Sequence, residues 1–153
     1  MSTHILFTHG KNPLSWLICK LTKEPTSHCA IQYDGWVLHS NFYGVHWERR
    51  LEFEHKCEIV HAVAVEDDPK RLITLAAEFG GKAGYDFFGL AYLGLRFALR
   101  MIGLHLPKKN LWQMSGMFLC TEWVSLYANG EVDSEITPEK LYERLLTKTP
   151  KGA

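Results

Sequence analysis

Residues 27–41 read SHCAIQYDGWVLHSN and contain the element that decides the fold. Two runs of strand-forming residues flank Asp34 and Gly35, and an Asp-Gly pair in that position predicts a β-hairpin with a two-residue type I′ turn. Such a turn fixes the register of the two strands, so that Tyr33 pairs with Trp36 and the other cross-strand pairs follow. The hairpin is therefore the starting point for placing side chains in space.

The predicted hairpin brings two histidines together. Because side chains alternate along a strand, one face carries His28, Ala30, Gln32, Val37, His39 and Asn41, and the other carries Cys29, Ile31, Tyr33, Trp36, Leu38 and Ser40. His28 and His39 are then diagonal neighbours within side-chain reach of each other. A histidine base needs a second polar group that holds its tautomer, and His39 or the Asn41 amide can supply it. The alternative is that His28 only caps a strand and His39 is an ordinary edge residue.

Turn residues divide the rest of the chain into short segments. We predict strands at residues 4–8, 29–33, 36–40, 44–48 and 57–65, and helices at 13–21, 68–79, 86–102, 117–128 and 138–146. Strands followed by separate helices indicate an α+β domain built on an antiparallel sheet. No repeat or linker divides the sequence, so we expect a single domain over residues 1–147 and a flexible C-terminal tail over residues 148–153.

Composition narrows the class of protein. The 153 residues are 46% hydrophobic, which is enough to build a core without disulfides or a metal. With 17 Lys plus Arg against 17 Asp plus Glu, the formal net charge is zero, which argues against a nucleic-acid binder. The first residues, MSTHILFTHGKNP, do not have the pattern of a signal peptide, so we expect cytoplasmic synthesis. The four cysteines form no CxxC pair, which is typical of free thiols.

The most apolar stretch is residues 83–106, which is long enough to cross a bilayer. It contains Asp86, Arg96 and Arg100, and a central charge costs about 2.5 to 3.5 kcal/mol on insertion. We therefore expect a buried or interfacial helix, and membrane contact through residues 87–106 is the alternative. Arg96 and Arg100 are spaced to bind anionic headgroups, but a core helix with one charged face is the preferred explanation.

Cys120 lies in residues 115–128, SGMFLCTEWVSLYA, near the start of a predicted helix. A thiol in the first turn is close to the positive end of the helix dipole, and a neighbouring imidazolium would lower its pKa further. Such a thiolate is a nucleophile at neutral pH, and the Cys120 backbone N–H is placed to serve an oxyanion hole. The alternative is a cysteine that only packs in the core, since cysteine is among the most buried residue types.

Several motifs occur together in a fixed order: SHCAI at 27–31, GV at 44–45, GYDFFGL at 84–90, FLCTEWV at 118–124 and TPEKLY at 137–142. Over about residues 26–145 this order resembles the circularly permuted NlpC-type cysteine peptidases, which are YiiX-like papain-fold hydrolases related to lecithin retinol acyltransferase. The resemblance implies a permuted papain-like fold, in which a small antiparallel sheet or barrel packs against helices. Thr121 in place of the usual Ser and Cys29 in place of the usual aliphatic residue depart from the pattern.

The resemblance also implies a set of site residues. Cys120 corresponds to the nucleophile, His28 to the general base and His39 to the third polar residue, with Asn41 as a weaker candidate for orienting His28. Tyr85 of the GYD motif is a candidate oxyanion or substrate contact, and a core tyrosine explains it equally well. No metal or cofactor is expected, because the only alternating set that we considered, His55, Cys57 and His61, lacks the spacing of a zinc site.

The implied function is a cysteine peptidase or amidase that cleaves an amide bond through a thioester acyl-enzyme. Peptides of bacterial peptidoglycan are the expected substrate, and because small members of the family occur in phage tails, viral tail proteins are candidate partners and the virion a candidate location. Two alternatives remain. One is a lipid amidase or acyltransferase of the lecithin retinol acyltransferase type, and the other is a non-catalytic papain-like module that binds or builds a tail assembly.

Overall fold

A computed structural model describes residues 2–41, 44–80, 94–96, 98–100, 102–105, 120–132 and 136–148. The helix predicted at 86–102 lies mostly outside these ranges, although its described residues 94–96 and 98–100 are helical. Tyr85 and the residues before Cys120 in the FLCTEWV motif also lie outside them. No helix in the described part of the chain is long and apolar enough to cross a membrane.

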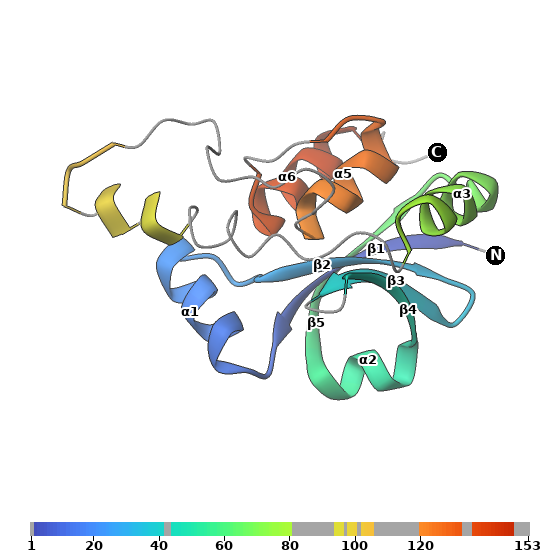
Figure 1. The fold of residues 1–153 in the computed structure, drawn as a ribbon, viewed down its shortest axis with the longest axis horizontal. Coiled ribbons are helices and arrows are strands. Elements are labelled where there is room, and N and C mark those ends of the chain that lie inside the picture. The colour runs from blue at the N-terminus through green and yellow to red at the C-terminus, as the bar shows by residue number, and fades with distance from the viewer. Residues whose placement is uncertain are drawn as a thin grey trace.

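The fold is built on a five-stranded sheet, which confirms the predicted α+β class (Figure 1). Its strands are β1 (Thr3–Gly10), β2 (His28–Tyr33), β3 (Trp36–Asn41), β4 (Gly44–Arg49) and β5 (Cys57–Val65). They lie in the order β4-β3-β2-β1-β5, and each neighbouring pair is antiparallel. The predicted strands are all present, with ends that differ by one or two residues.

The β2–β3 hairpin has the predicted turn and register. Asp34 and Gly35 both have positive φ angles, 45° and 79°, as a type I′ turn requires. Tyr33 pairs with Trp36, and the Gln32–Val37 and Ile31–Leu38 pairs follow in step. The assignment of side chains to the two faces of the hairpin is therefore confirmed for these pairs.

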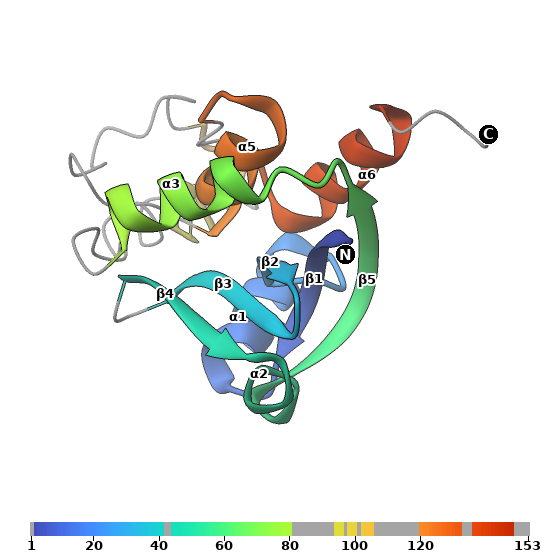
Figure 2. The same cartoon turned by 90° about the vertical axis from the view of Figure 1, so that its right-hand side faces the viewer.

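Helices lie on two sides of the sheet (Figures 1 and 2). One face is covered by α3 (Pro69–Phe79), α5 (Cys120–Asn129) and α6 (Pro138–Lys148). Its core contains Ile5, Phe7, Cys29, Ile31 and Leu38 from the strands and Leu72, Cys120, Trp123, Val124 and Leu141 from the helices. The opposite side carries α2 (Arg50–Lys56), which joins β4 to β5, and α1 (Pro13–Thr22) packs beside β1.

The sequence patterns at the predicted helix starts are confirmed where the structure describes them. Asp68 accepts a hydrogen bond from the Arg71 backbone N–H at 2.9 Å and so caps α3, with Pro69 at the first helical position. Thr137 likewise accepts from the Lys140 N–H at the start of α6. This helix continues to Lys148, so the predicted tail begins one residue too early, and residues 149–153 lie outside the described ranges.

Helix α2 was not predicted. Its seven residues begin at Arg50 without a side-chain cap, so no local signal marks its start. Its one buried residue, Phe53, is 3% exposed and packs with Leu6, Ala30, Val37 and Cys57 in a smaller second core. Packing against the sheet, and not local sequence preference, therefore accounts for this helix.

An irregularity in β5 corrects the predicted alternation of His55, Cys57 and His61. Phe7 pairs with His61, but Thr8 pairs with Ile59, so β5 has one extra residue at this point. The residues before and after the bulge face opposite sides. Cys57 belongs to the smaller core, and His61 stacks on the Tyr142 ring of α6 at 4.0 Å between ring centroids. Because His55 lies in α2, these three residues do not share a strand face.

The smaller core can be tested by truncating Phe53. We expect Phe53→Ala to lower the free energy of unfolding by about 3 to 5 kcal/mol, because it leaves a cavity between α2 and the sheet. Leu51→Ala in the same helix is the matched control, since Leu51 is 75% exposed and its loss should change stability by less than about 0.5 kcal/mol. Urea unfolding measures both. An equal effect of the two substitutions would mean that α2 does not depend on this core.

Candidate active site

The two histidines of the hairpin are in contact, as the register predicts. His28 Nε2 lies 3.3 Å from His39 Nδ1, and the two rings meet edge to face with their centroids 5.5 Å apart. His39 is only 5% exposed, and the ring of Phe53 packs against it at 5.0 Å. His28 is the first residue of β2 and is partly exposed. The buried histidine is thus in a position to orient the more accessible one.

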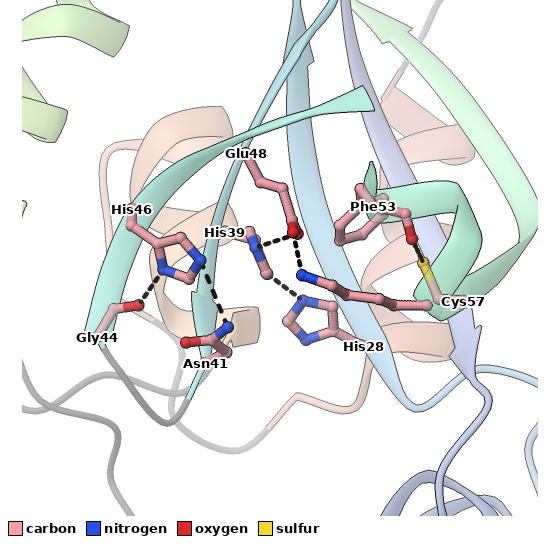
Figure 3. Close-up of polar contacts among 9 residues, drawn as sticks. His28, His39, Asn41, Gly44, His46, Glu48, Phe53 and Cys57 are labelled. Atoms are coloured by element: carbon pink, nitrogen blue, oxygen red, sulfur yellow. Dashed lines mark hydrogen bonds and ion pairs between the residues drawn. The ribbon is translucent and has the colours of Figure 1, made fainter. Parts of the chain in front are cut away.

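Glu48 of β4 lies behind His39, on the side away from His28 (Figure 3). Its Oε2 atom is 3.3 Å from His39 Nε2, and its Oε1 atom forms an ion pair with the Lys56 ammonium. Glu48 is 8% exposed, whereas the Lys56 side chain is 68% exposed. The sequence analysis missed Glu48, although extending the register into β4 would have found it, because Glu48 pairs with Val37 and therefore shares the face of His39.

Burial keeps His39 uncharged. Desolvation lowers the pKa of His39 to about 2, and the electrostatic influence of the neighbouring His28, His46 and Lys56 contributes to the same shift. A neutral imidazole carries one proton, and the Glu48 carboxylate favours the tautomer with that proton on Nε2. Nδ1 is then an acceptor for the proton on His28 Nε2. The direction of the His28–His39 hydrogen bond follows from these assignments.

Cys120 is the first described residue of α5, and it lies against Cys29 and His28. The Cys29 thiol hydrogen-bonds to Cys120 and holds the pKa of Cys120 well below its ordinary value, against the opposing effect of burial. The charge of His28 and hydrogen bonds from its side chain and from the Cys29 backbone lower it further. Burial and the neighbouring Cys120 raise the pKa of Cys29. Of the two buried thiols, Cys120 is the one beside His28 and the one whose pKa is lowered, whereas the pKa of Cys29 is raised.

The position of His28 explains how it reaches residues from both faces of the sheet. Cys29 points toward α5, so alternation directs His28 toward the face that carries His39 and Phe53. Because His28 begins the strand, its ring lies at the end of the sheet, where it interacts with His39 on one side and with Cys120 on the other. The three residues singled out in the sequence are therefore brought together.

The structure gives Asn41 a different neighbour from the one suggested by sequence. Asn41 Nδ2 lies 3.4 Å from His46 Nε2, while His39 is the residue in contact with His28. His46 Nδ1 in turn lies 3.0 Å from the carbonyl oxygen of Gly44, to which it donates. Asn41 thus orients a third histidine of the same face (Figure 3). Tyr85 lies outside the described residues.

A cavity of about 210 Å³ opens beside the two histidines. Its walls come from α1, α2 and residues of all five strands, and they include His28, His39, Asn41, Glu48 and Phe53. Most of the exposed lining is apolar. An extended side chain or a short acyl segment therefore has room next to the His28 ring.

A search against protein-family models finds no match to this chain, and a search of curated proteins finds none either.

Selective alkylation provides a direct test of the thiolate. At pH 6 we expect iodoacetamide to modify Cys120 faster than the other three cysteines, because its pKa is lowered whereas burial raises the pKa of Cys19 and raises that of Cys57 to about 11. Peptide mapping by mass spectrometry gives the four rates. His28→Gln should reduce the preference for Cys120, because the hydrogen bond from Cys29 remains. Equal rates at all four thiols would contradict an activated cysteine.

Proposed function

We propose that this protein is a cysteine hydrolase that cleaves an amide bond through a thioester acyl-enzyme. The observation that carries this proposal is the interaction of a lowered-pKa Cys120 with His28, whose second ring nitrogen lies 3.3 Å from a neutral, buried His39. A nucleophile, a base and an orienting group in series are what acyl transfer by a cysteine requires. In a protein whose cysteines only pack, nothing would require this alignment.

The proposed reaction uses the proton positions assigned above to the rings of His28 and His39. The Cys120 thiolate attacks the amide carbonyl, and the resulting oxyanion is held by N–H donors that include the Cys120 backbone. His28, as the imidazolium, gives its Nδ1 proton to the leaving nitrogen, and the C–N bond breaks to leave a thioester. Neutral His28 then takes a proton from water as the water oxygen attacks the thioester. The C–S bond breaks, and the acid product and the Cys120 thiolate are released.

His39 serves the proposed mechanism by staying neutral. While His28 is an imidazolium, its Nε2–H needs an acceptor, and the His39 Nδ1 lone pair is at hydrogen-bonding distance. A second cation at this position would repel the imidazolium, and the burial that lowers the pKa of His39 prevents this. His39 is thus proposed as a positioning residue, and Glu48 holds the tautomer that makes it an acceptor.

Two features support a permuted papain-like arrangement. The histidine lies on a strand near the N-terminus and the cysteine lies in the later helix α5, so the order along the chain is His then Cys. The cysteine helix packs on the face of an antiparallel sheet, and the third polar residue is on the strand next to that of the histidine. Both features are consistent with the permuted papain-like fold that the motif order suggests, and we include this fold in the proposal.

Peptidoglycan peptides are the proposed substrate class, on the strength of the motif resemblance. We expect purified protein to release products from peptidoglycan fragments, followed by liquid chromatography with mass spectrometry. Cys120→Ser should lower the rate at least about 10³-fold and His28→Gln about 10² to 10⁴-fold. Cys19→Ser is the matched control, because Cys19 pairs with His9 outside the lining of the cavity and its replacement should leave the rate unchanged. Folded protein that cleaves no amide would favour the non-catalytic tail module.

A lipid substrate is the second candidate, and one observation favours it. The described part of the apolar segment exposes Leu95, Ile102 and Leu104, which are 39%, 70% and 57% exposed. Large apolar side chains in water are suited to contact with a lipid surface.

Vesicle binding separates the two candidates. With peptidoglycan as substrate, we expect no cosedimentation with anionic phospholipid vesicles and no change in peptidoglycan cleavage in an Ile102→Ser, Leu104→Ser variant. Vesicle binding that this variant loses, together with cleavage of an N-acyl lipid and not of peptidoglycan, would establish the lipid candidate in its place. Arg96→Gln and Arg100→Gln test whether any binding depends on anionic headgroups.

A further inference from the structure

Three possible metal ligands meet on the face of the sheet behind the candidate active site. His39 of β3 and His46 and Glu48 of β4 each offer one ligand atom, and these atoms lie within 4.8 Å of one another. The β3–β4 register explains their meeting, because His39 pairs directly with His46, and Glu48 is two residues further along the same face. A His₂Glu set is one that proteins use to bind zinc with an open coordination position.

Two of these ligand atoms are buried and unsatisfied. His39 Nε2 and Glu48 Oε2 lie 3.3 Å apart, yet neither has a hydrogen-bond partner of suitable geometry. A buried polar atom without a partner is costly, and it calls for a group that can satisfy it. A cation bound by the carboxylate and by His39 Nε2, with the ring proton moved to Nδ1, would satisfy both atoms at once.

His46 is held in the tautomer that metal binding requires. Its Nδ1 donates to the Gly44 carbonyl oxygen at 3.0 Å, so that the lone pair is on Nε2. A backbone carbonyl in this role is a common outer partner of metal-binding histidines. Nε2 is at present paired with Asn41 Nδ2 at 3.4 Å, a long contact that a metal ion would replace.

We propose that His39, His46 and Glu48 form a binding site for a divalent transition-metal ion of the zinc type. Tetrahedral zinc places its nitrogen and oxygen ligands about 3.4 Å from one another. The separation of His39 Nε2 and Glu48 Oε2 already has this value, so only His46 has to move inward. His46 is half-buried on β4, which is an edge strand of the five-stranded sheet.

Lys56 neutralises the same carboxylate, that of Glu48, which the metal would neutralise. Its ammonium pairs with Glu48 Oε1 and neutralises the buried carboxylate in the metal-free protein. Because the Lys56 side chain is 68% exposed, its ammonium can move into water when a metal neutralises Glu48 instead. The cavity that reaches His39, Glu48 and Lys56 gives an ion a path to the site.

Metal binding and the proposed hydrolase activity exclude each other. Coordination through His39 Nε2 leaves the proton of that ring on Nδ1, which then donates and no longer accepts. The hydrogen bond from His28 Nε2 to His39 Nδ1 would be lost, and with it the support of the His28 imidazolium. This consequence rests on the proposed function, whereas metal binding itself does not.

Binding is tested by titrating Co²⁺, a visible substitute for Zn²⁺, into the chelator-treated Cys120→Ser variant, in which the nucleophilic thiol cannot contribute a ligand. We expect one ion per chain with cobalt d–d bands that Zn²⁺ displaces. In that background Glu48→Gln and His46→Gln should each weaken binding at least about tenfold. His55→Gln should not, because His55 is an exposed histidine of α2.

Lys56→Met gives a prediction of the opposite sign. It removes the cation that competes for Glu48, so we expect it to tighten Co²⁺ binding several-fold, a result that misfolding would not produce. Binding that none of these variants changes, or no displaceable cobalt spectrum, would overturn the site.

The coupling is tested separately in protein with Cys120 intact. Zn²⁺ should slow iodoacetamide labelling of Cys120, and His46→Gln should abolish the slowing without changing the metal-free rate. Cobalt binding without such slowing would confirm the metal site and overturn the coupling. Rapid metal-free labelling with no cobalt binding would leave the proposed hydrolase intact and overturn only the metal site.

Discussion

The register of β2 against β3 is the constraint on which the rest of the site depends. A two-residue turn at Asp34-Gly35 leaves no freedom to shift one strand by a residue, and a shift by one would send His39 to the α5 face. The register instead keeps the His39 ring in the smaller core beside Phe53. From this position it can touch His28, and its burial keeps it neutral. The β2–β3 register thus determines both the position of His39 beside His28 and its neutral state.

The sheet separates two kinds of chemistry that meet only at its end. The face under α5 holds the two thiols, Cys29 and Cys120, in an apolar core with Trp123 and Leu38. The other face holds His39, His46 and Glu48. Because His28 begins β2, it is the residue with access to both. The reactive sulfur can therefore sit among apolar side chains while the groups that handle protons stay on the other side of the sheet.

Local signals were enough to predict the hairpin, the helix starts and the pairing of His28 with His39, because each depends on neighbours in sequence. The other features depend on packing between distant segments. Helix α2 has no cap and exists because Phe53 is buried. The bulge that separates Cys57 from His61 has no mark in the sequence.

At the candidate site too, contacts within the hairpin could be predicted from the sequence and contacts between distant segments could not. Cys29 was placed on the face opposite His28, but nothing local indicated that α5 would bring Cys120 to that face. Glu48 required the register of a second hairpin, across residues 42–43. Its role behind His39 is visible only when three strands are placed side by side.

The neutrality of His39 also links folding to acidity. In the unfolded chain this imidazole would take up a proton near its ordinary pKa of about 6.5, whereas in the folded protein its pKa is about 2. Between these two pH values the unfolded state binds one more proton at His39 than the folded state does. The contribution of neutral His39 to the free energy of unfolding is therefore complete above about pH 6.5 and decreases as the pH falls toward 2. His39 thus both orients His28 and makes the folded protein less stable in acid. Protonation of this ring would destabilise the smaller core in which it is buried.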